Sequence, residues 1–392
     1  MTRRATLTHR ERVRRALEHQ EADRVPIDLG GVPIFTTMHR DAEVGLKAYL
    51  GLQGGTQVQT SMTSQTVRPD PRIMQRWDVD CYPLWVRSPN AWRLELRDEP
   101  DGGSWFIDEW GVKQARPAGG FYYDMAGHPL RGATLADLER FRFPQPRDPG
   151  RIAGLADEAR EIHENTSYCV VMNPVGATGV VAQGAFLCGF EDWFMKIASD
   201  KPFVRALVSM LEDFHIQQWD MILDTAGRYI DVALMSDDIG FQNGPQFRPA
   251  LYRELFKPTH ARIAAFIKSK APHIKVLYHS CGDVWQYLND FAENGFDAWN
   301  PVQVSCPDFQ DTARLKSTFG DKIAFWGGGV DTQSVLPFGT PNEVRAEVTR
   351  RMSDLKPGGG FVFATVQNVQ RDVPPENVVA CFDAALEQSW YE

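Results

Sequence analysis

The sequence predicts an α/β fold in which eight parallel strands close into a TIM (β/α)8 barrel. Short apolar runs recur along the 392-residue chain, and amphipathic stretches with helical periodicity separate them. Strands that alternate with helices form βαβ units, and eight such runs are the number that a TIM barrel requires. No G-x-G-x-x-G motif follows the first run, which disfavours a dinucleotide-binding sheet. A doubly wound open sheet is the alternative fold.

The eight runs are the predicted strands. In chain order they cover residues 24–28, 78–85, 167–175, 229–236, 274–279, 296–300, 322–326 and 361–366. Helices are expected between them. Val284, Leu288 and Phe291, for example, share one face of a predicted helix that stops at Gly295.

The arginine-rich N-terminal segment is predicted to belong to the fold rather than to a targeting peptide, because it lacks an apolar stretch. Thr8 and Glu11 have the spacing of a capping box, which predicts a helix through about His19. Val13 and Leu17 lie on one face of that helix.

An insertion is predicted at about residues 87–151, after the second strand, within a single domain spanning residues 1–392. This interval is too long for one barrel connection and is rich in Gly, Pro, Trp and Tyr. Residues 92–96 and 105–110 flank Asp101-Gly102-Gly103, a typical hairpin turn. We therefore expect a small β-rich segment near the barrel mouth.

Composition excludes several classes of function. The net charge is −9 and no basic stripe follows the first helix, so nucleic acid is not expected as a partner. A small molecule or another protein is expected as the partner instead. No window approaches 18 consecutive apolar residues, so no membrane span is expected. The six cysteines lack the spacing of a disulfide framework, which favours a reducing, cytoplasmic compartment.

Polar residues follow the predicted strands, at the barrel end where TIM-barrel enzymes carry their active sites. Adjacent residues on a strand face opposite ways, so only one of Asp237 and Asp238 is expected to point into the mouth. Asp238 is a candidate catalytic acid. The candidate substrate-binding residues are Asp28, Asn173, Asp237, Gln242, Gln303, Asp331 and Gln367.

His279-Ser280-Cys281-Gly282 ends the fifth run and carries the most specific chemistry. Side chains two apart on a strand point to the same face, so His279 and Cys281 can reach one ion. Imidazole and thiolate are zinc ligands, and zinc activates a bound thiol or water. Cys306, just past the sixth run, is the candidate third metal ligand, and the carboxylates of Asp238 and Asp331 are the other candidates.

Across nearly its whole length the chain resembles the uroporphyrinogen decarboxylase superfamily. The motifs that carry the resemblance occur in the same order along the chain. They begin at residues 15–17, 19–21, 23–26 and 108–111, and they continue at 237–240, 279–282, 300–303, 326–333 and 372–377. The resemblance implies a TIM barrel, which agrees with the eight runs.

The resemblance argues against porphyrinogen decarboxylation. True uroporphyrinogen decarboxylases hold their acidic substrate with an arginine-rich loop just after the first strand. Here that loop is Gly-Gly-Val-Pro-Ile-Phe at residues 30–35, with no arginine before Arg40. A mouth lined by aspartates would also repel a substrate that carries many carboxylates.

The chain is more similar to the zinc- and corrinoid-dependent methyltransferases of the superfamily, in which a His-x-Cys pair and a later Cys bind zinc. His279 and Cys281 match the pair, but the later position falls near Gln367. Related cobalamin-independent methionine synthases place a Glu where this chain has Gln303. The site is therefore completed by Cys306 or a water, or it binds substrate without a metal.

The resemblance implies a methyltransferase that moves a methyl group between a small O-, N- or S-methyl compound and a corrinoid protein or thiol. The corrinoid would come from a separate protein, because no Asp-x-His-x-x-Gly motif occurs in the chain. Related barrels often form homodimers. The alternatives are a decarboxylase or other lyase of a small carboxylic acid and, third, a barrel that binds a small ligand without catalysis.

Overall fold

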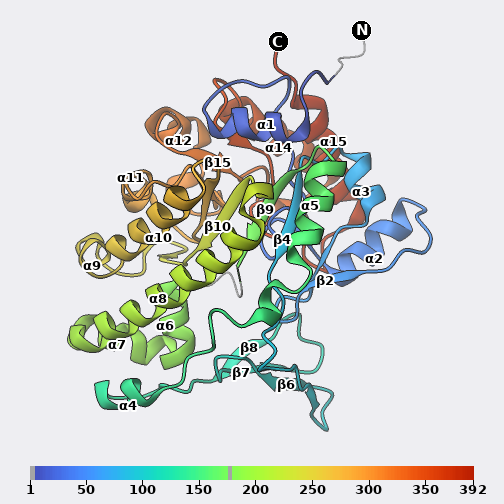
Figure 1. The fold of residues 1–392 in the computed structure, drawn as a ribbon. Coiled ribbons are helices and arrows are strands. Elements are labelled where there is room, and N and C mark those ends of the chain that lie inside the picture. Colours follow the sequence, from blue (N-terminus) through green and yellow to red (C-terminus); the bar gives the residue numbers. More distant parts are fainter. Residues whose placement is uncertain (1–4, 175–178) are drawn as a thin grey trace.

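The computed structural model describes residues 5–174 and 179–392. At its centre lies a curled sheet of seven parallel strands in the order β16-β15-β14-β13-β10-β9-β4 (Figure 1). The strands are β4 (Cys81–Trp85), β9 (Cys169–Asn173), β10 (Val232–Ser236), β13 (Lys275–His279), β14 (Ala298–Asn300), β15 (Ala324–Trp326) and β16 (Phe361–Val362). They fall in seven of the eight predicted runs, which confirms an α/β protein with a parallel sheet. Val175, which ends the third predicted run, lies outside the described residues.

The first predicted run, residues 24–28, contacts both edges of this sheet without forming a regular strand. Ile27 makes a parallel bridge with Phe363, just beyond β16. On the other side, the Asp80 N–H donates to the Ile27 carbonyl at 2.8 Å, just before β4. Pro26 has no N–H to donate, which limits the ladder at this position.

The inner face of the curled sheet holds its own apolar core. Side chains alternate along a strand, so every second residue points inward. Val171, Leu234 and Leu277 are fully buried there, in one cluster with residues from the other strands. The outward-facing residues pack in a second, larger cluster under the surrounding helices.

Helix α1 (His9–Leu17) closes the amino-terminal end of the sheet, because its Val13 and Leu17 belong to the inner core. The predicted capping box is confirmed, with Thr8 accepting from the Glu11 N–H and the Glu11 carboxylate accepting from Thr8. The buried Arg12 guanidinium also pairs with the fully buried Asp80 at 2.5 Å, beside the start of β4. The opposite, carboxyl-terminal end is left for binding.

Helices cover the outside of the sheet (Figure 1). The predicted helix at Val284 is divided into a 3-10 turn, Trp285–Tyr287, and α11 (Leu288–Glu293). The other helices are α2 (Arg40–Tyr49), α3 (Pro71–Arg76), α4 (Leu135–Arg140), α5 (Leu155–Asn165), α6 (Val180–Cys188), α7 (Phe190–Ser199), α8 (Lys201–Ala226), α9 (Pro249–Leu255), α10 (Lys257–Lys270), α12 (Thr312–Phe319), α13 (Val335–Phe338), α14 (Pro341–Leu355) and α15 (Pro375–Gln388).

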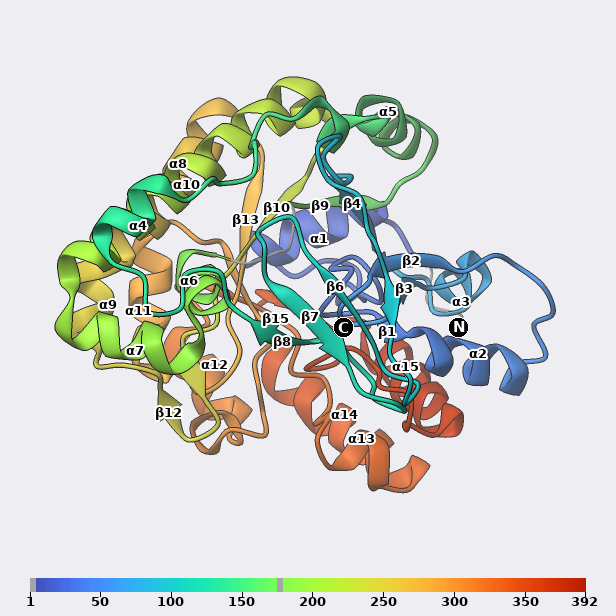
Figure 2. The same cartoon turned by 90° about the horizontal axis from the view of Figure 1, so that it is seen from below.

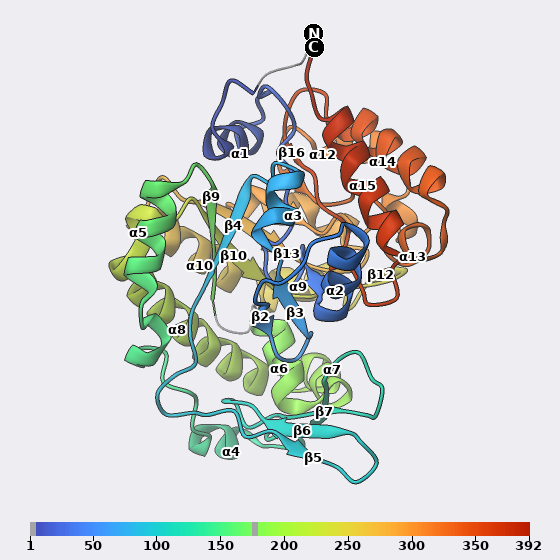
Figure 3. The same ribbon diagram turned by 90° about the vertical axis from the view of Figure 1, so that its right-hand side faces the viewer.

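A four-stranded antiparallel sheet occupies the interval predicted to be an insertion. It consists of β5 (Arg97–Asp98), β6 (Ser104–Ile107), β7 (Lys113–Arg116) and β8 (Asp124–Gly127). β5 and β6 form a hairpin around the predicted turn at residues 101–103, but its first strand is Arg97–Asp98 rather than residues 92–96. Figure 3 shows this sheet at the end of the molecule opposite α1, and Figure 2 shows β6 and β7 crossing that end.

Two further small sheets were not predicted. β1 (Met38–His39), β2 (Val58–Ser61) and β3 (Thr66–Arg68) form an antiparallel sheet between the first run and β4. β11 (Gly240–Phe241) and β12 (Gly244–Pro245) form a short hairpin after β10. Their strands are two to four residues long, too short to give a clear alternating pattern.

None of the helices in residues 5–174 and 179–392 combines the length and apolarity that crossing a membrane requires.

The buried histidine of α8 predicts an acid-sensitive fold. Burial lowers the pKa of His215 to about 4, whereas an unfolded histidine titrates near 6.5. Stability present above pH 6.5 is therefore lost as the pH falls from 6.5 to 4, by about 3 kcal/mol. Urea unfolding at pH 7.5 and pH 4.5 should show a smaller loss for His215→Leu than for the unsubstituted chain. His273→Leu, at an exposed position, should behave like the unsubstituted chain; equal losses in all three would contradict the prediction.

Candidate functional site

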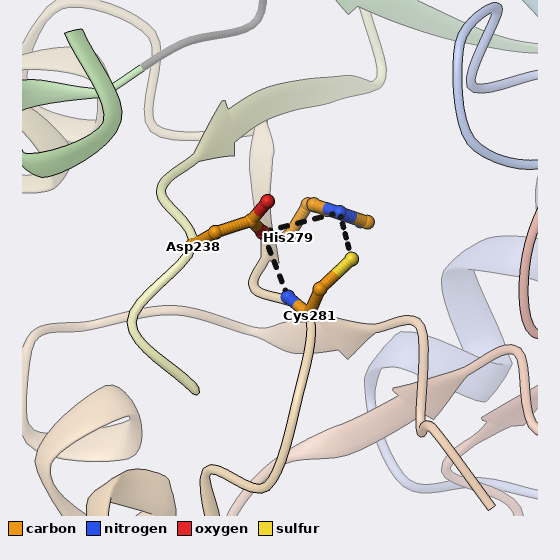
Figure 4. A group of neighbouring side chains, drawn as sticks. All are labelled: Asp238, His279 and Cys281. Atoms are coloured by element: carbon orange, nitrogen blue, oxygen red, sulfur yellow. Dashed lines mark hydrogen bonds and ion pairs between the residues drawn. The ribbon is translucent and has the colours of Figure 1, made fainter. Parts of the chain in front are cut away.

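Asp238, His279 and Cys281 lie together at the carboxyl ends of two adjacent strands (Figure 4). Their ligand atoms all lie within 4.8 Å of one another. His279 is the last residue of β13, and Ser236 of β10 lies opposite it in the parallel ladder. Cys281 and Asp238 follow in the loops after these two strands. Within the described part of the chain, no other group of three such residues has this geometry.

Two glycines bring the two loops into backbone contact. Gly282 has a φ of +84°, and a Cβ added to it would lie 2.3 Å from the carbonyl carbon of Gly240. A Cβ on Gly240 would in turn lie 2.7 Å from the Cys281 carbonyl oxygen. Only glycine fits at both positions. Because the backbones touch, the Asp238 carboxylate reaches the Cys281 N–H, which donates to Oδ1 at 2.8 Å.

Asn300 fixes the orientation of the His279 ring. The Asn300 Nδ2 donates to the Trp326 carbonyl at 2.8 Å, so its Oδ1 faces the ring. His279 Nδ1 lies 2.5 Å from that oxygen and therefore carries the proton. The unprotonated Nε2 then faces the Cys281 Sγ at 3.2 Å and the Asp238 Oδ1 at 3.6 Å. Metal-binding histidines commonly have this arrangement, in which a hydrogen bond to one ring nitrogen leaves the other free to bind the ion.

Burial sets the protonation of the pair. Burial lowers the pKa of His279, and the negative charge of Asp238 opposes that shift. Burial also raises the pKa of the Cys281 thiol well above its ordinary value, and Asp238 adds to the increase. The Phe35 ring stacks on the His279 ring, with centroids 3.4 Å apart and planes 4° apart. Without a cation the pair is therefore a neutral imidazole that accepts from a thiol.

The residues present fit a zinc ion. Bonds of about 2.0–2.3 Å to a tetrahedral zinc place its ligand atoms about 3.3–3.8 Å apart. The 3.2 Å between Nε2 and Sγ and the 3.6 Å between Nε2 and Oδ1 are close to these separations. A carboxylate, an imidazole and a thiol are all zinc ligands. The structure therefore contains a possible metal site at Asp238, His279 and Cys281.

Cys306, the expected third ligand, does not belong to this group. It is fully buried in the apolar core and precedes the 3-10 turn Pro307–Phe309. Burial raises its pKa to about 12. The structure brings Asp238 to the pair instead, through the backbone contact between Gly240 and Gly282.

The three predicted glutamines surround the Cys281 loop. Gln367 Nε2 lies 2.7 Å from Cys281 Sγ. Gln303 Oε1 accepts from the Gly282 N–H at 2.9 Å, and its Nε2 donates to Gln242 Oε1 at 2.9 Å. Gln303 therefore holds the loop that carries the thiol, whereas Gln367 contacts the thiol itself.

Three of the predicted substrate-binding aspartates have partners within the fold. Asp28 is fully buried and accepts from the Trp326 indole N–H at 2.8 Å, and burial raises its pKa to about 6. Asp237 accepts from the first-turn N–H groups of α6 and contacts His260 Nε2 at 3.0 Å. Asp331 accepts hydrogen bonds within its own turn. The side chains of Asp237 and Asp238 therefore have different surroundings, as adjacent strand-end residues should.

Asp238 lines one cavity, and a second cavity adjoins the first, because Ile34, Thr63 and Phe186 line both. The smaller has about 230 Å³ and contains Asp238 and Phe35 in its wall. The larger has about 290 Å³ and lies between the barrel and the β5–β8 sheet. Asn173, a predicted substrate-binding residue, lines the larger cavity. Of the two cavities, the smaller is therefore the one in contact with the possible metal site, through Asp238.

Asn300 and Phe35 are site residues that the sequence did not single out. Asn300 lies opposite His279 in the β13–β14 ladder, so the position of both residues at the ends of neighbouring predicted strands could have indicated their contact. Phe35 lies in a loop, and no spacing in the sequence places it on the histidine.

A curled parallel sheet with polar side chains gathered at its carboxyl ends defines an α/β protein with a barrel-type site. Residues 126–388 match the family model of uroporphyrinogen decarboxylase (URO-D), and the chain belongs to this family. The resemblance seen in the sequence is thus confirmed. The TIM fold of the family agrees with the curled sheet.

Individual relatives are distant. Uroporphyrinogen decarboxylase from Alkalilimnicola ehrlichii is 21% identical over 391 residues, which cover 97% of this chain and 94% of that protein. The enzyme from Legionella pneumophila is 31% identical over 147 residues, 37% of this chain and 39% of that protein. A methyltransferase from Methanosarcina mazei has a similar fold, with a TM-score of 0.63 and 18% identity over 97% of this chain and 99% of that one.

Gln367→Cys should strengthen zinc binding. The Gln367 side chain contacts Cys281 Sγ, so a thiol introduced there can act as an additional ligand. We expect at least a tenfold lower Kd for zinc, measured by competition with a chromophoric chelator. Gln370→Cys is the matched control, since Gln370 hydrogen-bonds to Asn368 instead. Equal affinities of the two variants would show that Gln367 does not face the ion.

Proposed function

We propose that the protein is a methyltransferase that moves a methyl group between a small methylated compound and a corrinoid or thiol acceptor. The observation that carries the proposal is the cluster of Asp238, His279 and Cys281, which has metal-ligand separations and whose Asp238 lines a cavity. The fold likeness to a protein named as a methyltransferase supports it.

Each residue of the cluster has a role in this proposal. Asp238, His279 and Cys281 would hold a zinc ion, and zinc would supply a lowered pKa for a bound thiol. Asn300 keeps the His279 Nε2 unprotonated and directed at the site. Gln303 holds the Cys281 loop. The two cavities that share Ile34, Thr63 and Phe186 would receive the methylated substrate. A closed eight-stranded barrel, with residues 24–28 as its eighth member, is part of the same proposal.

The loop after the first run supports a substrate with few negative charges. Pro33 and Ile34 line the larger cavity, and Ile34 and Phe35 line the smaller. A substrate with many carboxylates would need arginine or lysine side chains at these positions, which are apolar here. A separate corrinoid protein would dock at this open end, next to the β5–β8 sheet.

A decarboxylase of a small carboxylic acid is the second candidate, because the named relatives are uroporphyrinogen decarboxylases. One observation favours it. Asp238 lines a cavity and its side chain is 47% exposed, so it could give a proton to a carbanion. Release of CO2 without methyl transfer would support this alternative.

Zinc content and methyl transfer test the leading proposal together. We expect about one zinc per purified chain, lost in Cys281→Ser and in Asp238→Asn because each removes a ligand. Methyl transfer from a panel of O-, N- and S-methyl compounds to cob(I)alamin or a thiol should fall about 100-fold or more in both variants.

Cys306→Ala is the matched control for this experiment. Cys306 lies outside the cluster, so the variant should keep its zinc and its activity. Loss of zinc in Cys306→Ala, with zinc retained in Asp238→Asn, would show that Cys306 rather than Asp238 is the third zinc ligand. Metal-free protein whose methyl transfer survives Cys281→Ser would refute the zinc-dependent reaction.

A further inference from the structure

The larger cavity has an aromatic wall built from both the barrel and the β5–β8 region. Trp85 ends strand β4 and Phe186 belongs to α6, whereas Phe106 belongs to β6. Trp92 and Trp110 complete the set of five rings that line the cavity. The faces of aromatic rings carry negative electrostatic potential and attract cations.

The charges around this cavity are predominantly negative. Asp108 and Glu109 line the cavity, and Arg87 is the lining cation. Glu109 pairs with the buried Arg151, and Arg87 pairs with Glu158. Asp108 accepts only from neutral donors: two backbone N–H groups and the side-chain amide of Gln114. Its charge is therefore not neutralised by an ion pair.

Asn173, which lines this cavity and is 3% exposed, carries a buried acceptor. Its Nδ2 donates to two backbone carbonyls, whereas its Oδ1 has no hydrogen-bond partner within residues 5–174 and 179–392. A buried acceptor in this state favours a ligand that brings an O–H or N–H donor.

We propose that this cavity binds a methylated ammonium cation that carries a hydroxyl or N–H donor. Trp92, Phe106, Trp110 and Phe186 would contact the methylated nitrogen, whereas the Trp85 ring already carries the Arg87 guanidinium 5.2 Å from its centroid. Asp108 would balance the charge of the cation, and Asn173 Oδ1 would accept from the donor. A cavity of about 290 Å³ is large enough for such a small ion.

The cation would be the methyl donor, so this inference rests on the proposed function. The larger cavity shares Ile34, Thr63 and Phe186 with the cavity that contains Asp238. In the transfer, the carbon–nitrogen bond breaks and its electron pair stays on nitrogen, which leaves as a neutral amine. The lone pair of the acceptor, cob(I)alamin or a thiolate, forms the new bond to the methyl carbon. No oxidant or reductant is needed.

Calorimetric titration of the full-length chain with choline and with its neutral isostere, 3,3-dimethylbutan-1-ol, tests the proposal. The two probes share shape and hydroxyl and differ in charge. We expect choline to bind at least tenfold more tightly. Trp92→Leu and Asp108→Asn should each weaken choline binding about tenfold and leave the weaker binding of the isostere unchanged.

Trp105→Leu is the matched control. Trp105 precedes Phe106 on β6, does not line the larger cavity, and already carries Arg97 and Lys113 over its ring. Choline affinity should stay the same in this variant. Far-UV circular dichroism of each variant identifies any that fails to fold, and the two probes on the unsubstituted chain decide the question independently of the variants.

The outcomes separate this proposal from the methyltransferase itself. Equal or tighter binding of the isostere, or no binding of choline, overturns the cation site, even if neutral methyl compounds are demethylated. Tight choline binding that depends on Asp108 supports the site. If choline then transfers no methyl group to either acceptor, the cation site stands and its role as methyl donor is overturned.

Discussion

The candidate site depends on the contact between the backbones of Gly240 and Gly282. The first follows β10 and the second follows β13, and neither position has room for a side chain. This contact sets the distance between an acidic loop and a thiol loop. Asp238 then reaches the Cys281 N–H, and three potential ligand atoms meet within 4.8 Å. If the two loops lay further apart, the Asp238 carboxylate and the His279–Cys281 pair could not bind the same ion.

The seven-stranded parallel sheet supports this contact. Its inner core is apolar, α1 closes its amino-terminal end, and the ion pairs of Asp80 tie that helix to the start of β4. Polar side chains that take no part in this core gather at the other end. Asn300 connects the sheet to the site. Its side-chain amide donates to the backbone carbonyl of Trp326 in β15 and accepts from the ring of His279, whose orientation it fixes.

The parallel sheet could be predicted from the sequence because strands buried on both faces are continuous apolar runs. The run at residues 24–28 was predicted to be a regular strand, but Pro26 interrupts its hydrogen-bond ladder. The strands β1–β3 are too short to show the alternation of apolar and polar residues by which a strand is predicted. His279 and Cys281 could be recognised as a pair because they are neighbours in sequence. The choice between Asp238 and Cys306 could not be made, because it depends on how two loops pack. Glycine at positions 240 and 282 was visible in the sequence, but its contact was not.

The β5–β8 region supplies one wall of the larger cavity while the strand ends supply the other. The reactive cluster belongs entirely to the barrel side. In the proposed function, ligand choice and reaction chemistry would thus be carried by different parts of the chain. Substitutions in the outer wall can change which molecule is accepted without disturbing the core that keeps the protein folded. Such a division allows one scaffold to acquire new substrates by gradual mutation, with its reaction preserved at each step.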